Sequence, residues 1–457
     1  MVYDVVIIGG GPGGYAAALY AHNFGLSVAL VEKDRVGGTC LLRGCIPAKS
    51  WLKTAEVFTH IQKAAEFGVN VGEPSLDWGA ALARKNNIVD GLVSGLGGLL
   101  KTRNVEVIDG YGTLADGGVE VVGADGETRR LETRNVILAT GSKPRSIPGY
   151  EFDGNRIVSS DEALDWEERP NRVAIIGAGA IGSEFAFILG STGTEVHLFE
   201  MLDQVVPGAE PEAAKALTRE MKKRGIKVRT GIGVGPAEVN QDRVVVPFEG
   251  EYVDVDKVLV AVGRAPVTDN IGLETTKVEV DRGYILVDLN TMMTAEPNIY
   301  AVGDIVAGTP QLAHAGFAEG IAAITHIATG ETAPVDYRAI PLVVYTDPEV
   351  AAVGLTEAKA REAGYDVEVH DHGMRGLGRA IILGEVGGLV KIVSEKDGPI
   401  LGATVVAPAA GELIHELMYA VAWEALPAEA AAFIHAHPTM SEAIGETLLS
   451  AAGRSLH

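Results

Sequence analysis

The sequence predicts an α/β protein that contains one strand–turn–helix–strand unit twice and ends in a smaller α+β domain. The two units cover residues 4–32 and 172–200, and each joins apolar strands through a glycine-rich turn and a helical stretch. The part after about residue 336 has strands and helices without such a turn. With 457 residues the chain is long enough for about three domains, each with its own core.

The first glycine turn has the spacing G-x-G-x-x-G at Gly9, Gly11 and Gly14, directly after a strand and before a helix. Glycines at these places allow a tight turn, close approach of a pyrophosphate and close packing of the helix. Glu32 ends the next strand, where a carboxylate can accept a hydrogen bond from an adenosine ribose hydroxyl. This context favours a Rossmann-like dinucleotide site over a glycine-rich surface turn.

The second glycine turn repeats the pattern at Gly177, Gly179 and Gly182, with Glu200 as its acid. The acid follows the last glycine by 18 residues in both units (32 − 14 and 200 − 182). We therefore expect two bound nucleotides. A carboxylate at Glu200 favours a free 2′-hydroxyl and repels a 2′-phosphate, which predicts NAD rather than NADP.

The strands between and after these units suggest where the domains meet. Short apolar strands ending in turns are expected at 136–141, 257–264 and 298–304. We expect a first nucleotide-binding domain in 1–150 that is completed by 266–335, with the second nucleotide-binding domain, 151–265, between them. The last domain, 336–457, should contain a hairpin through Asp397-Gly398 and helices near 411–425 and 439–452.

The composition excludes some classes of partner. The chain has 38 basic and 61 acidic residues, a net charge of −23, so its field repels nucleic acid and anionic lipid surfaces. We read this charge as a solvated acidic surface. Its first residues lack a signal-peptide pattern, and no apolar stretch reaches the roughly 18 residues of a membrane helix. We expect a cytoplasmic protein with no membrane partner.

Cys40 and Cys45 are the only two cysteines of the chain. Five residues on a regular helix turn through about 500°, so the two side chains would lie roughly 140° apart, and Gly44 can supply an irregular turn that brings them together. A disulfide with a purely structural role would stabilise the fold by only about 2 kcal/mol, because the loop that it closes is so short. A zinc site would lack half of its ligands. We therefore favour a redox-active pair and expect no metal, with two buried thiols as the alternative.

Around these cysteines the segment GGTCLLRGCIPAKS resembles class I of the flavin-dependent pyridine nucleotide-disulfide oxidoreductases. The resemblance extends over nearly the whole chain and is closest to the branch that oxidises dihydrolipoyl groups. Its further motifs are ATG at 139–141, VGRAP at 262–266, YAVGD at 300–304, LAHAGFAEGI at 312–321, YTDPEVAAVGLTE at 345–357 and HAHPTMSE at 435–442.

The resemblance implies that FAD occupies the first unit and NAD the second, with Cys40 facing the thiol substrate and Cys45 the flavin. It implies that Asp304 holds the ribityl chain and that the helix starting near Ala313 faces the flavin pyrimidine. The residues alone would also allow Asp304 to be a turn residue or a helix N-cap. Further cofactor contacts are expected at Thr39, Gly141 and Gly263.

Two pairs of side chains complete the implied site. Lys49 and Glu184 match a pair near flavin N5, although sequence alone would allow an exposed lysine and a first-turn acid that stabilises a helix dipole. His437 and Glu442 match a base and its orienting carboxylate. His435 could instead be the important imidazole, and Glu442 could belong to a capping box.

The resemblance also implies partners: a homodimer in which the His437 segment reaches the disulfide of the other subunit, and the lipoyl-bearing subunits of a 2-oxo acid dehydrogenase or glycine-cleavage complex. The expected activity is oxidation of dihydrolipoyl groups with NAD as electron acceptor. A related enzyme acting on another disulfide, such as glutathione, is the alternative. A docking role on a multienzyme core would accompany catalysis.

Overall fold

The computed structural model describes residues 2–456, which fall into two compact units. Unit 1 comprises the chain up to Ser50, Leu82–Arg145 and Arg264–Tyr337. Unit 2 comprises Trp51–Ala81, Ser146–Gly263 and the chain from Arg338 onward. Among the described residues, no helix has both the length and the apolar character needed to cross a membrane.

Unit 1 is built on a sheet of seven strands whose central part is parallel. Strand β1 pairs in parallel with β2 and β6, and β6 also pairs in parallel with β19. The inner residues Val5, Val6 and Ile7 are fully buried, as expected for strands covered on both faces. The strands are β1 (Val2–Ile8), β2 (Val28–Glu32), β3 (Glu106–Asp109), β4 (Tyr111–Ala115), β5 (Gly118–Val122), β6 (Thr128–Leu138) and β19 (Ile299–Ala301).

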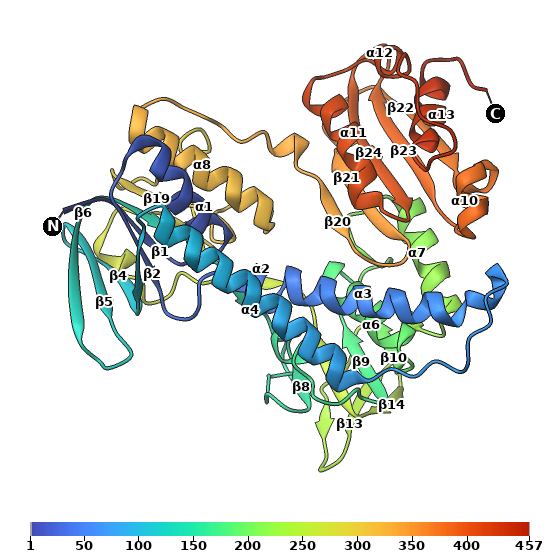
Figure 1. The fold of residues 1–457 in the computed structure, drawn as a ribbon, viewed down its shortest axis with the longest axis horizontal. Coiled ribbons are helices and arrows are strands. Elements are labelled where there is room, and N and C mark those ends of the chain that lie inside the picture. The colour runs from blue at the N-terminus through green and yellow to red at the C-terminus, as the bar shows by residue number, and fades with distance from the viewer. Residues whose placement is uncertain (1, 457) are drawn as a thin grey trace. The chain divides into compact units, whose positions relative to one another are not determined.

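Two helices lie together against this sheet, α1 (Pro12–Ala21) and α8 (Ala313–Thr329) (Figure 1). Their backbones approach closely because glycines meet at the crossing: a Cβ on Gly320 would lie 2.6 Å from the Gly13 carbonyl oxygen. Helix α2 (Gly38–Arg43) belongs to unit 1, whereas α3 (Cys45–Gln62) and α4 (Trp78–Thr102) have residues in both units.

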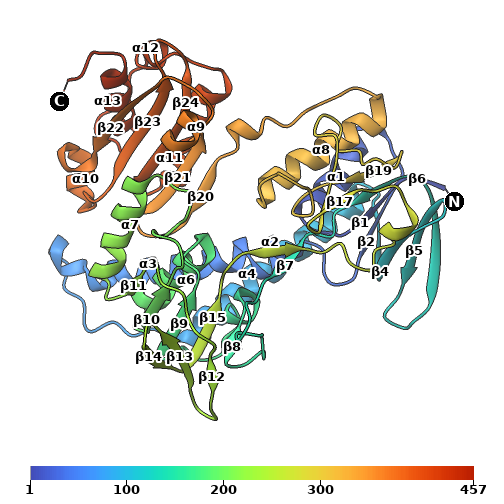
Figure 2. The ribbon, with the colours of Figure 1, turned by 180° about the vertical axis from the view of Figure 1, so that it is seen from behind.

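Unit 2 contains a second parallel sheet, in the order β11-β10-β9-β15-β8 (Figure 2). Helix α6 (Ala180–Ser191) follows β9 and helix α7 (Pro211–Lys223) follows β10, so the second expected unit is present. The strands are β8 (Ile157–Val158), β9 (Arg172–Ile176), β10 (Glu195–Phe199), β11 (Lys227–Arg229) and β15 (Lys257–Val260), with a small sheet of β12 (Glu238–Val239), β13 (Val244–Phe248) and β14 (Glu251–Val255).

The last part of unit 2 is an antiparallel sheet with helices packed on it, which confirms the predicted α+β domain. Its hairpin turns at Asp397, which has a positive φ of 55°. Helix α11 (Ala410–Ala422) packs on β21 and β24, and α13 (Glu442–Ala451) packs on β22 and β23. The strands are β20 (Leu342–Val344), β21 (Glu349–Gly354), β22 (Val367–Gly373), β23 (Leu389–Glu395) and β24 (Ile400–Ala407).

The chain leaves and re-enters unit 1 through two short strands that pair with each other. Strand β7 (Ser142–Pro144) and strand β16 (Arg264–Pro266) are antiparallel, with Pro144 opposite Arg264. The stretch Trp51–Ala81 belongs to unit 2, although it lies inside the expected 1–150 domain. The four-part domain division stays a prediction.

Candidate active site

The first glycine turn has the geometry of a dinucleotide site. Gly9 has a φ of 109°, and a Cβ on Gly14 would lie 1.9 Å from the Gly9 carbonyl oxygen, so neither position tolerates a side chain. The Glu32 carboxylate accepts the Gly10 N–H at 2.6 Å. Burial raises the pKa of Glu32, although the Gly10 N–H opposes this effect. No described side chain caps α1, whose first N–H groups are therefore suited to a pyrophosphate.

The second glycine turn repeats this construction. Gly177 has a φ of 99°, and a Cβ on Gly182 would lie 1.9 Å from the Gly177 carbonyl oxygen. The Glu200 carboxylate accepts the Ala178 N–H at 2.7 Å and the Leu202 N–H at 2.9 Å. A Cβ on Gly179 would meet no atom within 4 Å, which leaves room beside the turn. The residues of both turns fit a dinucleotide.

The two cysteines lie on consecutive helices. Helix α2 ends at Arg43, Gly44 takes an irregular conformation with φ −143° and ψ −108°, and Cys45 begins α3. The break expected from the spacing is therefore present at Gly44. Both residues are half-buried. A hydrogen bond with Cys45 raises the pKa of the Cys40 thiol, as does burial, while the charge of Lys49 opposes both effects.

Tyr15 is a neighbour of the cysteines that is not among the expected site residues. Burial raises its pKa to about 12, and negative charge on Cys40 or Cys45 adds to the shift. Its ring lies 5.6 Å from that of Phe317, between ring centroids. The tyrosine follows Gly14 directly, so the glycine turn and the thiols share one region of unit 1.

The two members of the expected Lys49–Glu184 pair belong to different units. Lys49 lies close enough to Cys40 for its charge to act on that thiol. Glu184 lies beyond the first turn of α6, which corrects the helix-dipole alternative. Its buried carboxylate accepts the backbone N–H of Tyr345 at 3.0 Å. Their pairing stays a prediction.

Asp304 lies in a turn that follows β19, and its carboxylate has a side-chain partner. Ser142 donates its hydroxyl to Asp304 Oδ2 at 2.5 Å, and Ser142 Oγ accepts from Arg264 Nε at 2.7 Å. The N-cap of α8 is Leu312, so the alternative of Asp304 as a helix N-cap is wrong. Arg264 lies within the VGRAP motif and Ser142 directly follows ATG at 139–141, yet 122 positions separate the two residues, and neither motif alone indicates that they meet.

Three further expected cofactor contacts lie at turns or at a helix start. Gly141 follows the loop after β6 with a φ of 72°, and Gly263 precedes β16 with a φ of 112°. A Cβ on either glycine would meet nothing within 4 Å. Ala313 is the first residue of α8, which has no side-chain cap among the described residues. These features leave room and backbone donors for a ligand.

His437 and Glu442 form a pair near the start of α13. His437 Nδ1 lies 2.8 Å from Glu442 Oε1, and the imidazole is 77% exposed. Glu442 Oε2 also accepts the Thr439 N–H at 2.8 Å. Burial alone would raise the pKa of Glu442, but this N–H and His437 hold it below its usual value. The N-cap of α13 is Ser441, without a side-chain cap, and Glu442 is the first residue of the helix, so the capping-box alternative is wrong although Glu442 accepts the Thr439 N–H.

His435 has a different carboxylate. Its Nε2 lies 2.7 Å from Glu416 Oε1, and its side chain is only 12% exposed. A Cβ on Gly445 would lie 2.6 Å from His435 Nδ1, so this ring is packed against α13. The hydrogen bond to Glu416 raises the pKa of His435. His437 is the imidazole accessible to a substrate, and His435 is held inside the domain.

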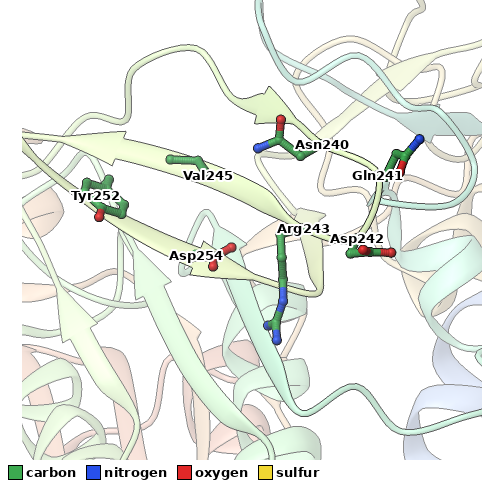
Figure 3. Close-up of a pocket in the computed structure, with 7 residues that line it drawn as sticks. All are labelled: Asn240, Gln241, Asp242, Arg243, Val245, Tyr252 and Asp254. Atoms are coloured by element: carbon green, nitrogen blue, oxygen red, sulfur yellow. The ribbon is translucent and has the colours of Figure 1, made fainter.

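A separate shallow hollow lies on the small sheet of unit 2 (Figure 3). Arg243, one of its lining residues, forms an ion pair with Asp256 at 2.7 Å. None of the expected site residues lines this hollow. Its lining residues are Asn240, Gln241, Asp242, Arg243, Val245, Tyr252 and Asp254.

Comparison with known families agrees with this geometry. The family model described as "Pyridine nucleotide-disulphide oxidoreductase" matches residues 3–320, and the dimerisation domain of the same family matches residues 340–448. Together these matches include both glycine turns, the cysteines and the His437 segment. The chain belongs to the pyridine nucleotide-disulphide oxidoreductases.

Relatives that match over the full length define the branch. The chain is 40% identical to a dihydrolipoyl dehydrogenase of Bacillus subtilis over 100% of this chain and 99% of the relative. It is also 40% identical to that of Chlamydia muridarum, over 100% and 98%. The crystal structure of LpdA from Mycobacterium tuberculosis is similar, with a TM-score of 0.91, 28% identity and coverage of 98% and 99%. These relatives place the chain in the dihydrolipoyl dehydrogenase branch of the family.

Proposed function

We propose that this protein oxidises dihydrolipoyl groups, with FAD at the first glycine turn and NAD, the electron acceptor, at the second. The observation that carries the proposal is the pair of cysteines on either side of the Gly44 break, in the same unit as the first glycine turn and Asp304. In the proposed domain division, 1–150 and 266–335 bind FAD, 151–265 binds NAD, and 336–457 forms the homodimer.

The thiol chemistry starts from a Cys40–Cys45 disulfide. A substrate thiol gives its proton to His437 of the partner subunit and attacks Cys40, which forms a mixed disulfide and releases the Cys45 thiolate. The second substrate thiol attacks the substrate sulfur, the bond to Cys40 breaks, and the departing Cys40 sulfur takes up the proton of that thiol. The substrate loses two electrons and two protons, and the enzyme disulfide gains the electrons. Bound FAD and NAD supply the two-electron chemistry that restores the disulfide.

The protein's own groups prepare this exchange. A hydrogen bond with Cys45 and burial raise the pKa of the Cys40 thiol, while the charge of Lys49 acts in the opposite direction and favours a thiolate at Cys40. Glu442 orients His437 through Nδ1, which leaves Nε2 of the exposed ring to accept a proton. Asp304 and the start of α8 are the proposed flavin contacts.

The proposal is tested by adding dihydrolipoamide to the purified protein without oxygen, followed by NAD. We expect the flavin absorbance to change on the first addition and NADH to appear only after the second. NADP should be used less well than NAD because of Glu200. A protein that carries no flavin, or that reduces glutathione disulfide faster than it oxidises dihydrolipoamide, would contradict the proposal.

Cys45→Ser tests the division of roles between the two sulfurs. Without Cys45 no internal disulfide forms, so we expect NAD reduction by dihydrolipoamide to be abolished and the long-wavelength absorbance of a thiolate against flavin to be lost. Flavin content serves as the control, since the variant should still bind FAD. Turnover at the wild-type rate would show that the exchange does not use this pair.

The physiological partner is proposed to be a lipoyl-bearing subunit of a 2-oxo acid dehydrogenase or glycine-cleavage complex. The support is the dihydrolipoyl dehydrogenase relationship over the whole chain. Co-purification with such a core, and reoxidation of its lipoyl groups by the isolated dimer, are the measurements that test this partner.

A further inference from the structure

Arg264 is the first residue of unit 1 after the chain returns from unit 2. It begins β16, and its guanidinium forms three hydrogen bonds. Nε donates to Ser142 Oγ at 2.7 Å, and Nη2 donates to the Ser142 carbonyl at 2.8 Å and to Thr39 Oγ1 at 3.3 Å. One side chain therefore joins the strand on which the chain leaves the unit to the residue before Cys40.

The bonds continue from Ser142 to Asp304. The serine hydroxyl accepts from the Arg264 guanidinium and donates to the Asp304 carboxylate at 2.5 Å. Ser142 is only 8% exposed and its two charged partners, Arg264 and Asp304, are half-buried, so the hydroxyl between them is shielded from water. Hydrogen bonds to charged groups are about twice as strong as neutral ones, and a chain of them polarises each member.

The relay touches both parts of the proposed redox site. Thr39 lies in α2 directly before Cys40, and Asp304 lies in the turn after β19. These two residues are 265 positions apart (304 − 39), and Arg264 with Ser142 is the hydrogen-bonded connection between them. A shift of the guanidinium would alter the geometry of the thiol segment and of the carboxylate together.

We propose that Arg264 is a positioning residue: it holds Asp304 and the Cys40 segment in the relative positions in which both can contact FAD. The inference rests on the proposed function, in which Asp304 and the cysteines meet the flavin. This role requires an arginine because two nitrogens of the guanidinium bind Ser142 while a third hydrogen bond reaches Thr39. A lysine ammonium offers a single nitrogen and cannot occupy the Nε and Nη2 positions together.

The test compares the purified holoenzyme with the variants R264K, R264M and S142A. The readouts are the equilibrium dissociation constant of FAD and the visible spectrum of the bound flavin, neither of which requires turnover. We expect the dissociation constant to rise tenfold or more in R264K and R264M, with a changed flavin spectrum. R282K is the matched control, since Arg282 is exposed and pairs only with its neighbour Asp281 among the contacts described.

A double variant separates positioning from general loosening of the fold. If Arg264 acts on Asp304 through Ser142, R264K/S142A should lose no more FAD affinity than the worse of the two single variants. Strictly additive losses would overturn the relay, and wild-type affinity and spectrum in R264K and R264M would overturn the role of Arg264. Failure of the wild-type protein itself to bind FAD would instead overturn the proposed function.

Discussion

At the scale of single residues, the two histidines of the HAHPTMSE segment show how neighbouring imidazoles acquire different tasks. His437 is exposed and bound to Glu442, whereas His435 is packed on Gly445 and bound to Glu416. The difference lies in which carboxylate each ring meets and in its access to solvent. A proton acceptor for an external thiol must be accessible, which favours His437.

This assignment predicts opposite outcomes for the same substitution in the two pairs. Glu442→Gln keeps an oxygen for the Thr439 N–H but loses the charge that stabilises the imidazolium, so we expect turnover to fall about 10- to 100-fold. Glu416→Gln, the matched control, should leave turnover near the wild-type value. Steady-state NAD reduction measures both, and equal losses would show that the rings act together.

Glu319 is a buried carboxyl group whose protonation should make the stability of the protein depend on pH. It is fully buried on α8, and its carboxylate accepts the Gly303 N–H at 2.5 Å and the Tyr337 hydroxyl at 3.1 Å. Burial raises its pKa from 4.5 to about 7, and the charge of Asp304 adds to the shift. The folded protein therefore holds a proton here that the unfolded chain releases at lower pH.

The sign of this shift predicts how stability depends on pH. The stabilisation from the protonated Glu319 is complete below pH about 4.5 and is lost as the pH rises to about 7. The loss is at most about 3 kcal/mol, from 1.36 kcal/mol per unit of pKa. E319Q removes this dependence. Between pH 5 and 8, the melting temperature of the wild type should fall relative to that of E319Q as the pH rises. Parallel curves would contradict the expectation.

At the scale of elements, a buried lysine joins three carboxylates that lie at the starts of two helices. Lys391 on β23 is 2% exposed and lies 2.9 Å from Glu210, 3.1 Å from Glu212 and 3.0 Å from Glu357. Burial by itself lowers the pKa of Lys391, but the three hydrogen bonds raise it well above its usual value. The cluster ties the starts of α7 and α9 (Glu357–Glu362) to the C-terminal sheet.

Removing this lysine should be costly because Glu210 is equally buried. Lys391→Met leaves a buried carboxylate without its cation, and we expect the free energy of unfolding to fall by about 3–5 kcal/mol. Lys223→Met is the control, since Lys223 is 63% exposed and its pair with Glu220 contributes little. Urea midpoints at pH 7 measure both. Similar shifts for the two variants would disprove the cluster's role.

The elements that the sequence predicts well are those whose pattern is local. Both glycine turns, their acids and the Gly44 break lie where spacing and backbone freedom place them. Lys391 was not singled out, because it sits in a strand whose polar partners come from residues 34 and more than 170 positions away. The Arg264–Ser142–Asp304 relay was missed for the same reason: long-range contacts leave no periodic signal.

At the scale of the whole molecule, the C-terminal domain presents large apolar side chains to solvent. Ile434 is 98% exposed and Phe433 is 76% exposed, directly before the His435 to His437 segment. This part of the chain matches the family's dimerisation domain. Large exposed apolar groups next to a histidine proposed to serve the other subunit fit a surface covered by a second copy.

A double variant of this surface tests the dependence of activity on assembly. F433E/I434E places two charges where the homodimer would bury apolar groups, so we expect sedimentation as a monomer and loss of turnover by about 100-fold or more. FAD content should remain at the wild-type level because the glycine turns lie elsewhere in the chain. A fully active monomer would contradict the shared site.

The antiparallel pairing of β7 with β16 has a consequence for how this protein could be re-engineered. Paired strands lie about 5 Å apart, so the two ends of the stretch 145–263 lie side by side, as the two strands of a hairpin do. Transplanting that stretch from a relative with another nicotinamide preference would therefore need no new linkers, provided that Ser142 and Arg264 stay with the recipient.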